Sequence, residues 1–347
     1  MVAEKERVFL DFVKMVSTGT NLRIVIDDLV RSDLGAMIVF DSPELYSQNL
    51  FEGGFRINCR FTTQKLFELC KMDGAVIVSA DLQRILYANV LMTPDSSVYT
   101  DETGTRHKAS ERVAKQAGNL VITVSERKRK TTLYYSNSKY VVKTPEELIR
   151  NISSSLHVLE KQRELFNEQK LNLNVLEMSD LASVSDVCKA IQRAEMILKI
   201  SDNMKRSFLE MGKEGNIMHM RYRELIRGVE KSENEIIRDY SSLTLKKTRN
   251  LLDNITFDGL LDIDSIARLV VGKSLEENIS PRGFRFLSNM ALTEREVSQI
   301  VKNFGSLKKI LEAESLDFEQ FLKGRSGSVK EGLKNLREQI LSGKVTD

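Results

Sequence analysis

Length, composition and charge limit the class of this protein before any motif is considered. The chain has 347 residues, of which 41% are hydrophobic and 29% are charged, and its formal net charge is +3. This length suggests roughly two or three domains with hydrophobic cores, and so small a net charge does not by itself indicate a nucleic-acid-binding protein. No apolar run approaches the roughly 18 residues that a membrane-spanning helix needs, and the N-terminus lacks the apolar core of a signal peptide. We therefore expect a soluble, cytoplasmic, multi-domain protein.

Helical and strand patterns alternate through residues 1–144. Helical patterns cover residues 22–30, 62–71 and 103–117, and strand patterns cover residues 36–40, 75–79, 85–92, 120–125 and 133–135. Such alternation with short links is typical of an α/β domain. We expect residues 1–144 to form this domain around a central mixed sheet.

Residues 145–280 are predicted to form an all-α spine. No proline occurs between Pro145 and Pro281, and proline breaks helix interiors. Apolar residues recur there at steps of three, five and seven residues among polar ones: Leu156, Leu159, Phe166, Leu171, Leu176 and Leu181. Residues 281–347 are expected to form a third, small domain of short helices separated by glycines.

The cysteines and histidines do not indicate a metal site or a disulfide framework. There are three of each, without CxxC spacing: Cys59, Cys70, Cys188, His107, His157 and His219. The sequence also lacks Walker A, GxGxxG and HExxH motifs, so the common nucleotide and zinc-hydrolase templates are excluded.

The predicted helix at 103–117 begins with an unusual number of basic side chains. Arg106, His107 and Lys108 lie in its first turn, where the helix dipole is already positive, which costs up to about 1 kcal/mol. Thr103 or Thr105 is a suitable N-cap. An anion bound at this turn would make the arrangement favourable, because free N–H groups and cations would converge on it. A solvated basic turn is the alternative.

Asp73 and Gly74 lie between a predicted helix and a predicted strand. An Asp-Gly pair is a routine helix-ending turn. It also places a carboxylate where it can hold a divalent metal or orient a sugar hydroxyl, beside a glycine that lets a nucleotide approach the backbone. Both interpretations stay open for this segment alone.

A run of charge from Ser125 to Lys130 lies at a predicted hairpin turn between two strands. A charged turn of this kind is usually only solvated. It can also supply cations to a polyphosphate, with the Ser125 hydroxyl donating a hydrogen bond.

Taken together, these segments resemble the DisA family of diadenylate cyclases, the DNA integrity scanning proteins. The family's signatures are an Asp-Gly-Ala turn and an Arg-His-Arg element after Gly-Thr. Here they read Asp73-Gly74-Ala75 and Gly104-Thr105-Arg106-His107-Lys108. The likeness covers nearly the whole chain and is strongest over residues 20–140.

The resemblance implies an enzyme that condenses two ATP molecules into cyclic di-AMP and releases two pyrophosphates, with Mg²⁺ or Mn²⁺ as cofactor. It implies Asp73, Arg106 and His107 as catalytic residues, with Asp73 binding the metal or activating the 3′-hydroxyl. The implied ATP contacts are Gly74, Ala75, Met92, Thr105, Arg106, His107, Lys108, Ala109, Ser125 and Lys128. The family is octameric, with the spine holding cyclase domains of different subunits in facing pairs.

Three positions depart from the family pattern. Lys108 replaces the final arginine of the signature, which keeps the charge but loses the bidentate fork. Ala109 stands where the family usually has threonine, and Met92 where it usually has leucine. No essential type of group is lost, so activity is expected. Two alternatives stay open: a DNA-binding or scaffold protein with weakened catalysis on the cyclase fold, and a different ATP-using transferase.

The resemblance further implies a C-terminal helix-hairpin-helix module that binds DNA phosphates without sequence preference. In this chain the family's Gly-apolar-Gly hairpin is replaced by Lys323-Gly324-Arg325-Ser326-Gly327-Ser328. We expect any DNA contact at Lys323, Gly324, Arg325 and Gly327, between helices around 316–322 and 329–341. A small helical cap or assembly domain is the alternative.

Overall fold

The computed structural model describes residues 2–322 and 325–343, and the chain divides into two compact units. The first unit contains Met1–Ser153 and Lys205–His219, and the second contains Ser154–Met204 and Met220–Asp347. Two long helices, α6 (Pro145–Met178) and α7 (Val184–Met211), contribute residues to both units. The three-part division at residues 144 and 280 stays a prediction.

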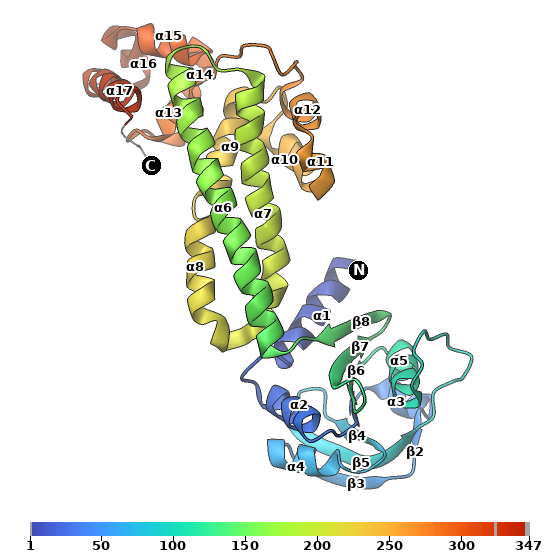
Figure 1. The fold of residues 1–347 in the computed structure, drawn as a ribbon. Helices are drawn as coiled ribbons and strands as arrows, with labels where there is room; N and C mark the ends of the chain where they lie inside the picture. Colours follow the sequence, from blue (N-terminus) through green and yellow to red (C-terminus); the bar gives the residue numbers. More distant parts are fainter. Residues whose placement is uncertain (1, 323–324, 344–347) are drawn as a thin grey trace. The chain divides into compact units, whose positions relative to one another are not determined.

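The first unit is built on an eight-stranded mixed sheet (Figure 1). The strand order is β2-β5-β4-β1-β6-β7-β8, and β3 also pairs with β5. Strands β1 and β4 pair in parallel, and the other pairings in the described part of the sheet are antiparallel. The strands are β1 (Ala36–Phe40), β2 (Phe51–Glu52), β3 (Phe55–Arg60), β4 (Ala75–Val78), β5 (Arg84–Met92), β6 (Leu120–Ser125), β7 (Lys130–Tyr135) and β8 (Ser138–Val142). The predicted α/β class with a central mixed sheet is confirmed.

Helices cover both faces of this sheet, which explains why its central strands are apolar without alternation. In β1, Ile38 and Phe40 pack in the core beneath α1, α2 and α4, whereas Met37 and Val39 pack in the core beneath α3 and α5. These helices are α1 (Val2–Met15), α2 (Asn21–Arg31), α3 (Pro43–Ser47), α4 (Thr63–Leu69) and α5 (Thr105–Ala117). A strand buried on both faces reads in the sequence as a continuous apolar run, so β1, β4 and β6 were predictable.

The sequence patterns missed β2, β3 and β8, which lie at the margins of the sheet. Strand β3 pairs only with β5, and its register shifts between Arg56 and Cys59. Its apolar and polar side chains alternate, but Ile57 and Cys59 are only partly buried and the other four residues are exposed. Strand β8 pairs only with β7 and keeps three of its five residues exposed. Exposed strands at the margin of a sheet carry polar side chains, and a search for apolar runs passes over them.

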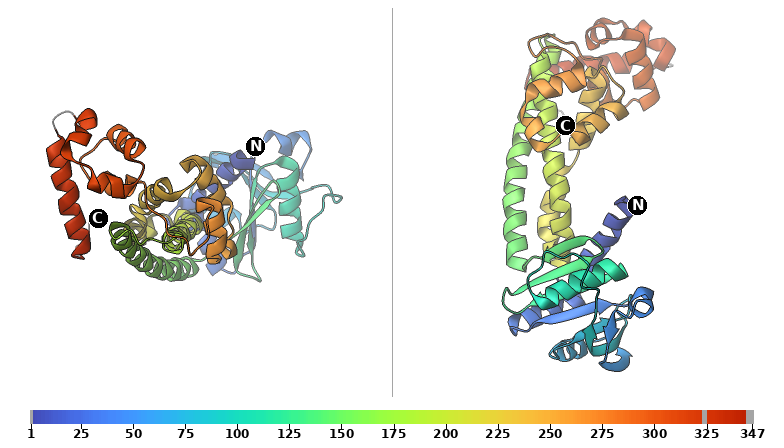
Figure 2. Two further views of the ribbon diagram at one scale, coloured as in Figure 1. Left: turned by 90° about the horizontal axis from the view of Figure 1, so that it is seen from above. Right: turned by 90° about the vertical axis from the view of Figure 1, so that its right-hand side faces the viewer.

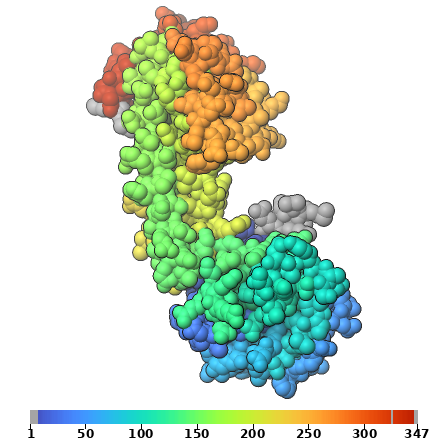
Figure 3. Space-filling view, turned by 45° about the vertical axis from the view of Figure 1, so that its right-hand side comes forward, coloured from blue at the N-terminus to red at the C-terminus, as the bar shows by residue number. Residues whose placement is uncertain are grey.

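The second unit is helical, as predicted. Helices α6 and α7 lie side by side (Figures 1 and 2). The helices that follow pack against them around one apolar core, which includes Leu173, Ile191, Ile237 and Leu252. Figure 3 shows the helices from α10 to η2, coloured orange, packed closely against the green α6. Between α7 and Pro281 the chain forms η1 (Gly212–Gly215), α8 (Asn216–Ile226), α9 (Val229–Tyr240), α10 (Leu245–Asn254), α11 (Phe257–Leu261), α12 (Ile263–Ile266) and η2 (Ala267–Val271). Of these, η1 and residues 216–219 of α8 belong to the first unit.

Short helices after Pro281 share a separate apolar core. They are α13 (Phe284–Ser288), α14 (Glu294–Phe304), α15 (Leu307–Glu312), η3 (Ser315–Phe318), α16 (Glu319–Leu322) and α17 (Ser326–Leu341). The expected helix around 316–322 corresponds to η3 and α16, and the one around 329–341 to α17, which begins three residues earlier. Lys323 and Gly324 lie outside the described residues. None of the described helices combines the length and the apolar character needed to cross a membrane.

Candidate active site

The candidate residues from separate parts of the sequence meet along one edge of the sheet. Strands β1 and β4 are parallel and both begin at this edge, while the antiparallel strands β5 and β6 end there. The register pairs Ala75 with Val90 and Ala36 with Val124. Adjacent strands lie about 4.8 Å apart, so the four strands place Met92, Asp73 and Ser125 along roughly 15 Å of one edge.

Gly74 lies directly against the backbone of Asn89. Its N–H donates to the Asn89 side-chain oxygen at 3.0 Å, and a Cβ at this position would come within 2.5 Å of the Asn89 carbonyl carbon. The close approach therefore requires glycine, because any side chain would displace β5. Neighbouring Asp73 is exposed, and its carboxylate has no hydrogen bond or ion pair with the described residues. Met92 is buried at the end of β5.

A cavity of about 620 Å³ lies between the start of α5 and the β6–β7 hairpin. This volume is within the range of small-molecule sites, about 300–1,000 Å³. Its lining includes five of the predicted residues: Thr105, Arg106, His107, Ser125 and Lys128. It also includes cations that the resemblance did not single out, Arg127, Lys130 and Lys139. Gly74, Ala75 and Met92 lie along the sheet edge outside this lining, and the half-buried Lys108 and Ala109 on α5 do not line the cavity.

Arg106 connects this cavity with the sheet edge. Its guanidinium packs over Gly35, the residue before β1, so closely that a Cβ on Gly35 would overlap it. Burial raises the pKa of Cys70, at the end of α4, to about 12, and the charge of Arg106 opposes that rise. The positive charge of Arg106 therefore acts on Cys70 at the end of α4, three residues before Asp73.

The first turn of α5 has no side-chain cap, contrary to the expectation that Thr103 or Thr105 would provide one. The helix begins at Thr105, and its N-cap is Gly104, which has an extended backbone and no side-chain oxygen. The N–H groups of the first turn are therefore left without a side-chain acceptor. Together with Arg106 and His107, they are suited to an anion.

His107 is oriented by a chain of polar side chains that runs into the domain. Its Nδ1 lies 2.9 Å from the Tyr134 hydroxyl, which donates to Glu102 at 2.7 Å, and Glu102 is ion-paired with Lys139. A tyrosine hydroxyl has one proton, and here that proton points to Glu102. His107 Nδ1 therefore carries a proton and donates to Tyr134. The Nε2 atom is an acceptor in the neutral ring and becomes a second donor when the ring is protonated.

The electrostatics of this chain keep His107 neutral and Glu102 charged. Burial lowers the pKa of His107; the charges of Lys128, Lys139 and Arg106 lower it further, and Glu102 opposes them. Burial would raise the pKa of Glu102, but the hydrogen bonds from Lys139 and Tyr134 outweigh it, so that pKa is lowered. The negative charge of a bound phosphate would raise the pKa of His107, because it stabilises the imidazolium.

Sequence reasoning missed Glu102, Tyr134 and Lys139. Tyr134 is 27 residues from His107 and is an unremarkable aromatic residue in a predicted strand. Lys139 belongs to β8, which was not predicted. No local pattern marks these residues, because only the pairing of β7 with β8 and the packing of α5 on the sheet bring them together.

Comparison with known proteins covers almost the whole chain. The family described as DisA bacterial checkpoint controller nucleotide-binding matches residues 23–139, and the family described as DisA bacterial checkpoint controller linker region matches residues 142–278. The DNA integrity scanning protein DisA of Clostridium kluyveri is 38% identical over 350 residues, covering 98% of this chain and 99% of that protein. The protein of the same name from Clostridium botulinum strain Loch Maree is 36% identical, covering 99% and 100%. That of Clostridium tetani is 37% identical, covering 97% and 96%. The chain therefore belongs to the DisA family of DNA integrity scanning proteins, and residues 23–139 are its nucleotide-binding region.

Proposed function

We propose that this protein is a diadenylate cyclase that condenses two ATP molecules into cyclic di-AMP and releases two pyrophosphates. One observation carries the proposal: a carboxylate, a glycine-lined backbone and a cationic cavity lie along one edge of the sheet. Asp73 and Gly74 provide the first two, and Arg106, His107 and Lys128 provide the third. The DisA family membership supports the same reaction.

The reaction needs positioning and charge stabilisation more than a covalent nucleophile. The 3′-oxygen of one ATP bonds to the α-phosphorus of the other and loses its proton. The bond from that phosphorus to the bridging oxygen breaks, and pyrophosphate leaves. The same exchange in the opposite direction closes the ring.

The residues of the cavity can stabilise the charge that develops on the phosphates. Arg106 and Lys128 offer fixed positive charge, and the protonated His107 donates from Nε2. The hydroxyls of Thr105 and Ser125 orient phosphate oxygens. Gly74, Ala75 and Met92 would receive the adenosine along the sheet edge. Lys108 and Ala109 do not line the cavity, so we leave them out of the proposed phosphate contacts.

Mg²⁺ or Mn²⁺ suits the donors that this edge offers. In the part of the chain that the structure describes, no group of three or more His, Cys, Asp or Glu residues could hold a metal ion. Magnesium is often held by only one or two carboxylates together with substrate phosphates, and the exposed Asp73 can serve as such a carboxylate. The bound ion would supply Lewis-acid stabilisation of the phosphate charge. Asp73 would hold it or accept the 3′-hydroxyl proton.

The two-fold character of the reaction leads us to propose a homo-oligomer with facing sites. One subunit offers one set of phosphate ligands, whereas the product contains two identical linkages. The octamer that the family resemblance implies would be one such arrangement. Light scattering should detect a large homo-oligomer, and specific activity should fall on dilution. A fully active monomer would contradict the proposal.

The direct test is to incubate the full-length protein with ATP and Mn²⁺ or Mg²⁺ and to separate the products chromatographically. We expect cyclic di-AMP and pyrophosphate in a ratio of about one to two, as the reaction requires. ATP binding without turnover would favour the alternative of a DNA-binding scaffold on a cyclase fold. An adenylylated second substrate would favour a different transferase.

A further inference from the structure

A second cavity, of about 520 Å³, lies wholly within the helical second unit. Helix α6 lines one side of it, and the turn between α8 and α9 together with the start of α9 lines another. Residues of α13 and the end of α17 complete the lining. Nothing in the proposed cyclase reaction uses this cavity.

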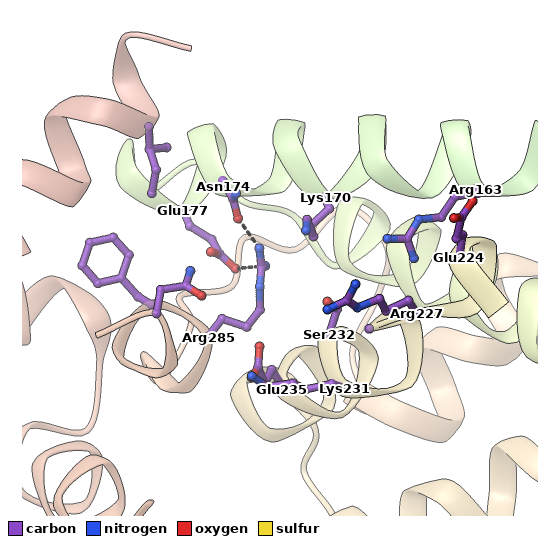
Figure 4. A pocket seen from close by; sticks show the side chains of 14 residues that line it. Arg163, Lys170, Asn174, Glu177, Glu224, Arg227, Lys231, Ser232, Glu235 and Arg285 are labelled. Carbon is purple, nitrogen blue, oxygen red and sulfur yellow. Dashed lines mark hydrogen bonds and ion pairs between the residues drawn. The ribbon is translucent and has the colours of Figure 1, made fainter. Parts of the chain in front are cut away.

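Cationic side chains from different helices face this cavity. Arg163 and Lys170 are seven residues apart on α6 and therefore share one face of that helix. Arg227 and Lys231 come from the opposite side, and Figure 4 shows Lys170 and Arg163 facing Arg227 across the gap. With Arg285, the lining holds five cations against three carboxylates: Glu177, Glu224 and Glu235.

Two ion pairs join members of this lining, and the exposed Arg227 takes part in neither. Arg285 is buried and pairs with Glu177 at 2.7 Å, and Lys231 lies 3.9 Å from Glu235. Arg227 is exposed and forms no side-chain hydrogen bond or ion pair with the described residues. Burial raises the pKa of Glu177 to about 7 and also raises the pKa of Glu235. These two acids therefore offset less of the positive charge near neutral pH than ordinary glutamates would.

The rest of the lining is suited to a larger ligand than inorganic phosphate. The buried side chains of Phe286 and Ile340 form an apolar wall, and the Asn174 and Asn289 amides add hydrogen-bonding groups. A cavity of this volume, with apolar walls and a few convergent polar groups, has the character of a small-molecule site. Arginine and lysine clusters are the usual partners of phosphate groups.

We propose that this cavity binds a phosphorylated small molecule, with Arg227 and the α6 cations Arg163 and Lys170 holding its phosphate groups. The shared ligand chemistry is a phosphate or pyrophosphate group. It can come from a nucleotide, whose base would contact Phe286 and Ile340, or from a free polyphosphate. The site is separate in sequence and in lining from the candidate active site.

Hydrogen-exchange mass spectrometry on the full-length protein tests this proposal, because it reports each region separately. Pyrophosphate and AMP, added in separate experiments, should slow amide exchange in peptides covering residues 160–178 and 226–236. Tighter binding of AMP would identify a nucleotide site, and tighter binding of pyrophosphate a polyphosphate site. No slowing at millimolar concentration, or equal slowing by sulfate, would overturn the proposal. Slowing by duplex DNA alone would also overturn it.

Arg227→Ala and Arg223→Ala form a matched pair of variants. Both arginines are exposed, and only Arg227 lines the cavity. Arg227→Ala should weaken binding about tenfold or more, the effect of losing one charge-assisted hydrogen bond. It should not alter the melting temperature, nor exchange in residues 103–130. Arg223→Ala should bind as the unmodified protein does. Unchanged binding in Arg227→Ala would refute the assignment.

Discussion

Replacing Tyr134 by phenylalanine tests whether the polar chain from Lys139 to His107 positions the imidazole for catalysis. The change removes one hydroxyl from a fully buried side chain that does not line the cavity. His107 Nδ1 then loses its acceptor at 2.9 Å, and Glu102 loses a donor at 2.7 Å. Glu102 keeps its ion pair with Lys139, so its charge stays compensated.

The expected magnitudes follow from the kinds of hydrogen bond that are lost. A hydrogen bond between neutral groups contributes about 0.5–1.5 kcal/mol and one to a charged group about 1.5–3 kcal/mol. Since about 1.36 kcal/mol corresponds to a tenfold rate change, Tyr134→Phe should lower kcat/KM for ATP by about 2- to 12-fold. His107→Ala, which removes the proposed contact with phosphate, should lower it by about 12- to 160-fold.

The pH dependence provides a second readout. The lowered pKa of His107 means that its ring is neutral near pH 7 before ATP binds, whereas phosphate binding favours the protonated ring. Affinity for ATP should therefore increase as the pH falls from 8 to 6. The negative charge of Glu102 stabilises the protonated His107 ring, so Glu102→Gln should lower the pKa of His107 further. The increase in ATP affinity should then occur at lower pH. The ring can be followed by NMR, because the chain has only three histidines.

Comparing single and double variants decides whether Tyr134 acts through His107. The double variant Tyr134→Phe/His107→Ala should be no slower than His107→Ala alone. Tyr135→Phe is the matched control: this neighbour packs against Phe12 in the other core, and the change should leave the rate and the pH profile unaltered. Multiplicative effects in the double variant, or the same losses in Tyr135→Phe, would refute the reasoning.

Three further predictions concern the sheet edge and the C-terminal helices. Asp73→Asn should abolish cyclic di-AMP formation without lowering the melting temperature, because the exposed carboxylate has no partner in the described structure. Turnover near that of the unmodified protein would show that Asp73 has neither of its two proposed roles, metal binding and acceptance of the 3′-hydroxyl proton. Gly74→Ala should destabilise the protein by about 1–3 kcal/mol through its clash with Asn89, measured by chemical denaturation, whereas Gly327→Ala has open space and should not. DNA binding should be weak and should fall with salt at a slope of about −0.9 per phosphate contact. Weak binding is expected because residues 282–347 hold twelve basic and nine acidic side chains, and Arg325 is already paired with Glu296. Tight DNA binding that is insensitive to salt and to Lys323→Ala/Arg325→Ala would place the contact surface elsewhere.

The sequence alone was sufficient for the central strands and for two segments that line the cavity of the first unit. Strands β1, β4 and β6 are buried on both faces, and this produces continuous apolar runs that are visible without any partner strand. The basic turn at Arg106 and His107 and the charged hairpin after Ser125 are local patterns, and the structure brings both into one cavity. These features need only neighbouring residues to be recognised.

Other features of the first unit depend on distant parts of the chain. Glu210, from the end of α7, is fully buried there and accepts hydrogen bonds from the Lys143 N–H and the Tyr140 hydroxyl, each at 2.6 Å. Proline spacing predicted a boundary at residue 144 and carried no sign that residues 205–219 belong to this unit. A buried carboxylate needs such partners, but it can take them from any part of the chain that the fold brings near.

The tertiary structure alone decided how the site is assembled. Parallel pairing of β1 with β4 and antiparallel pairing with β6 put Asp73 and Ser125 at the same edge, although 52 residues separate them in the sequence. The same packing places Tyr134 between His107 and Glu102, and brings Arg227 opposite Lys170 in the second unit. Local propensity and periodicity describe one element at a time, whereas these arrangements arise from register and packing between elements that the sequence pattern does not encode.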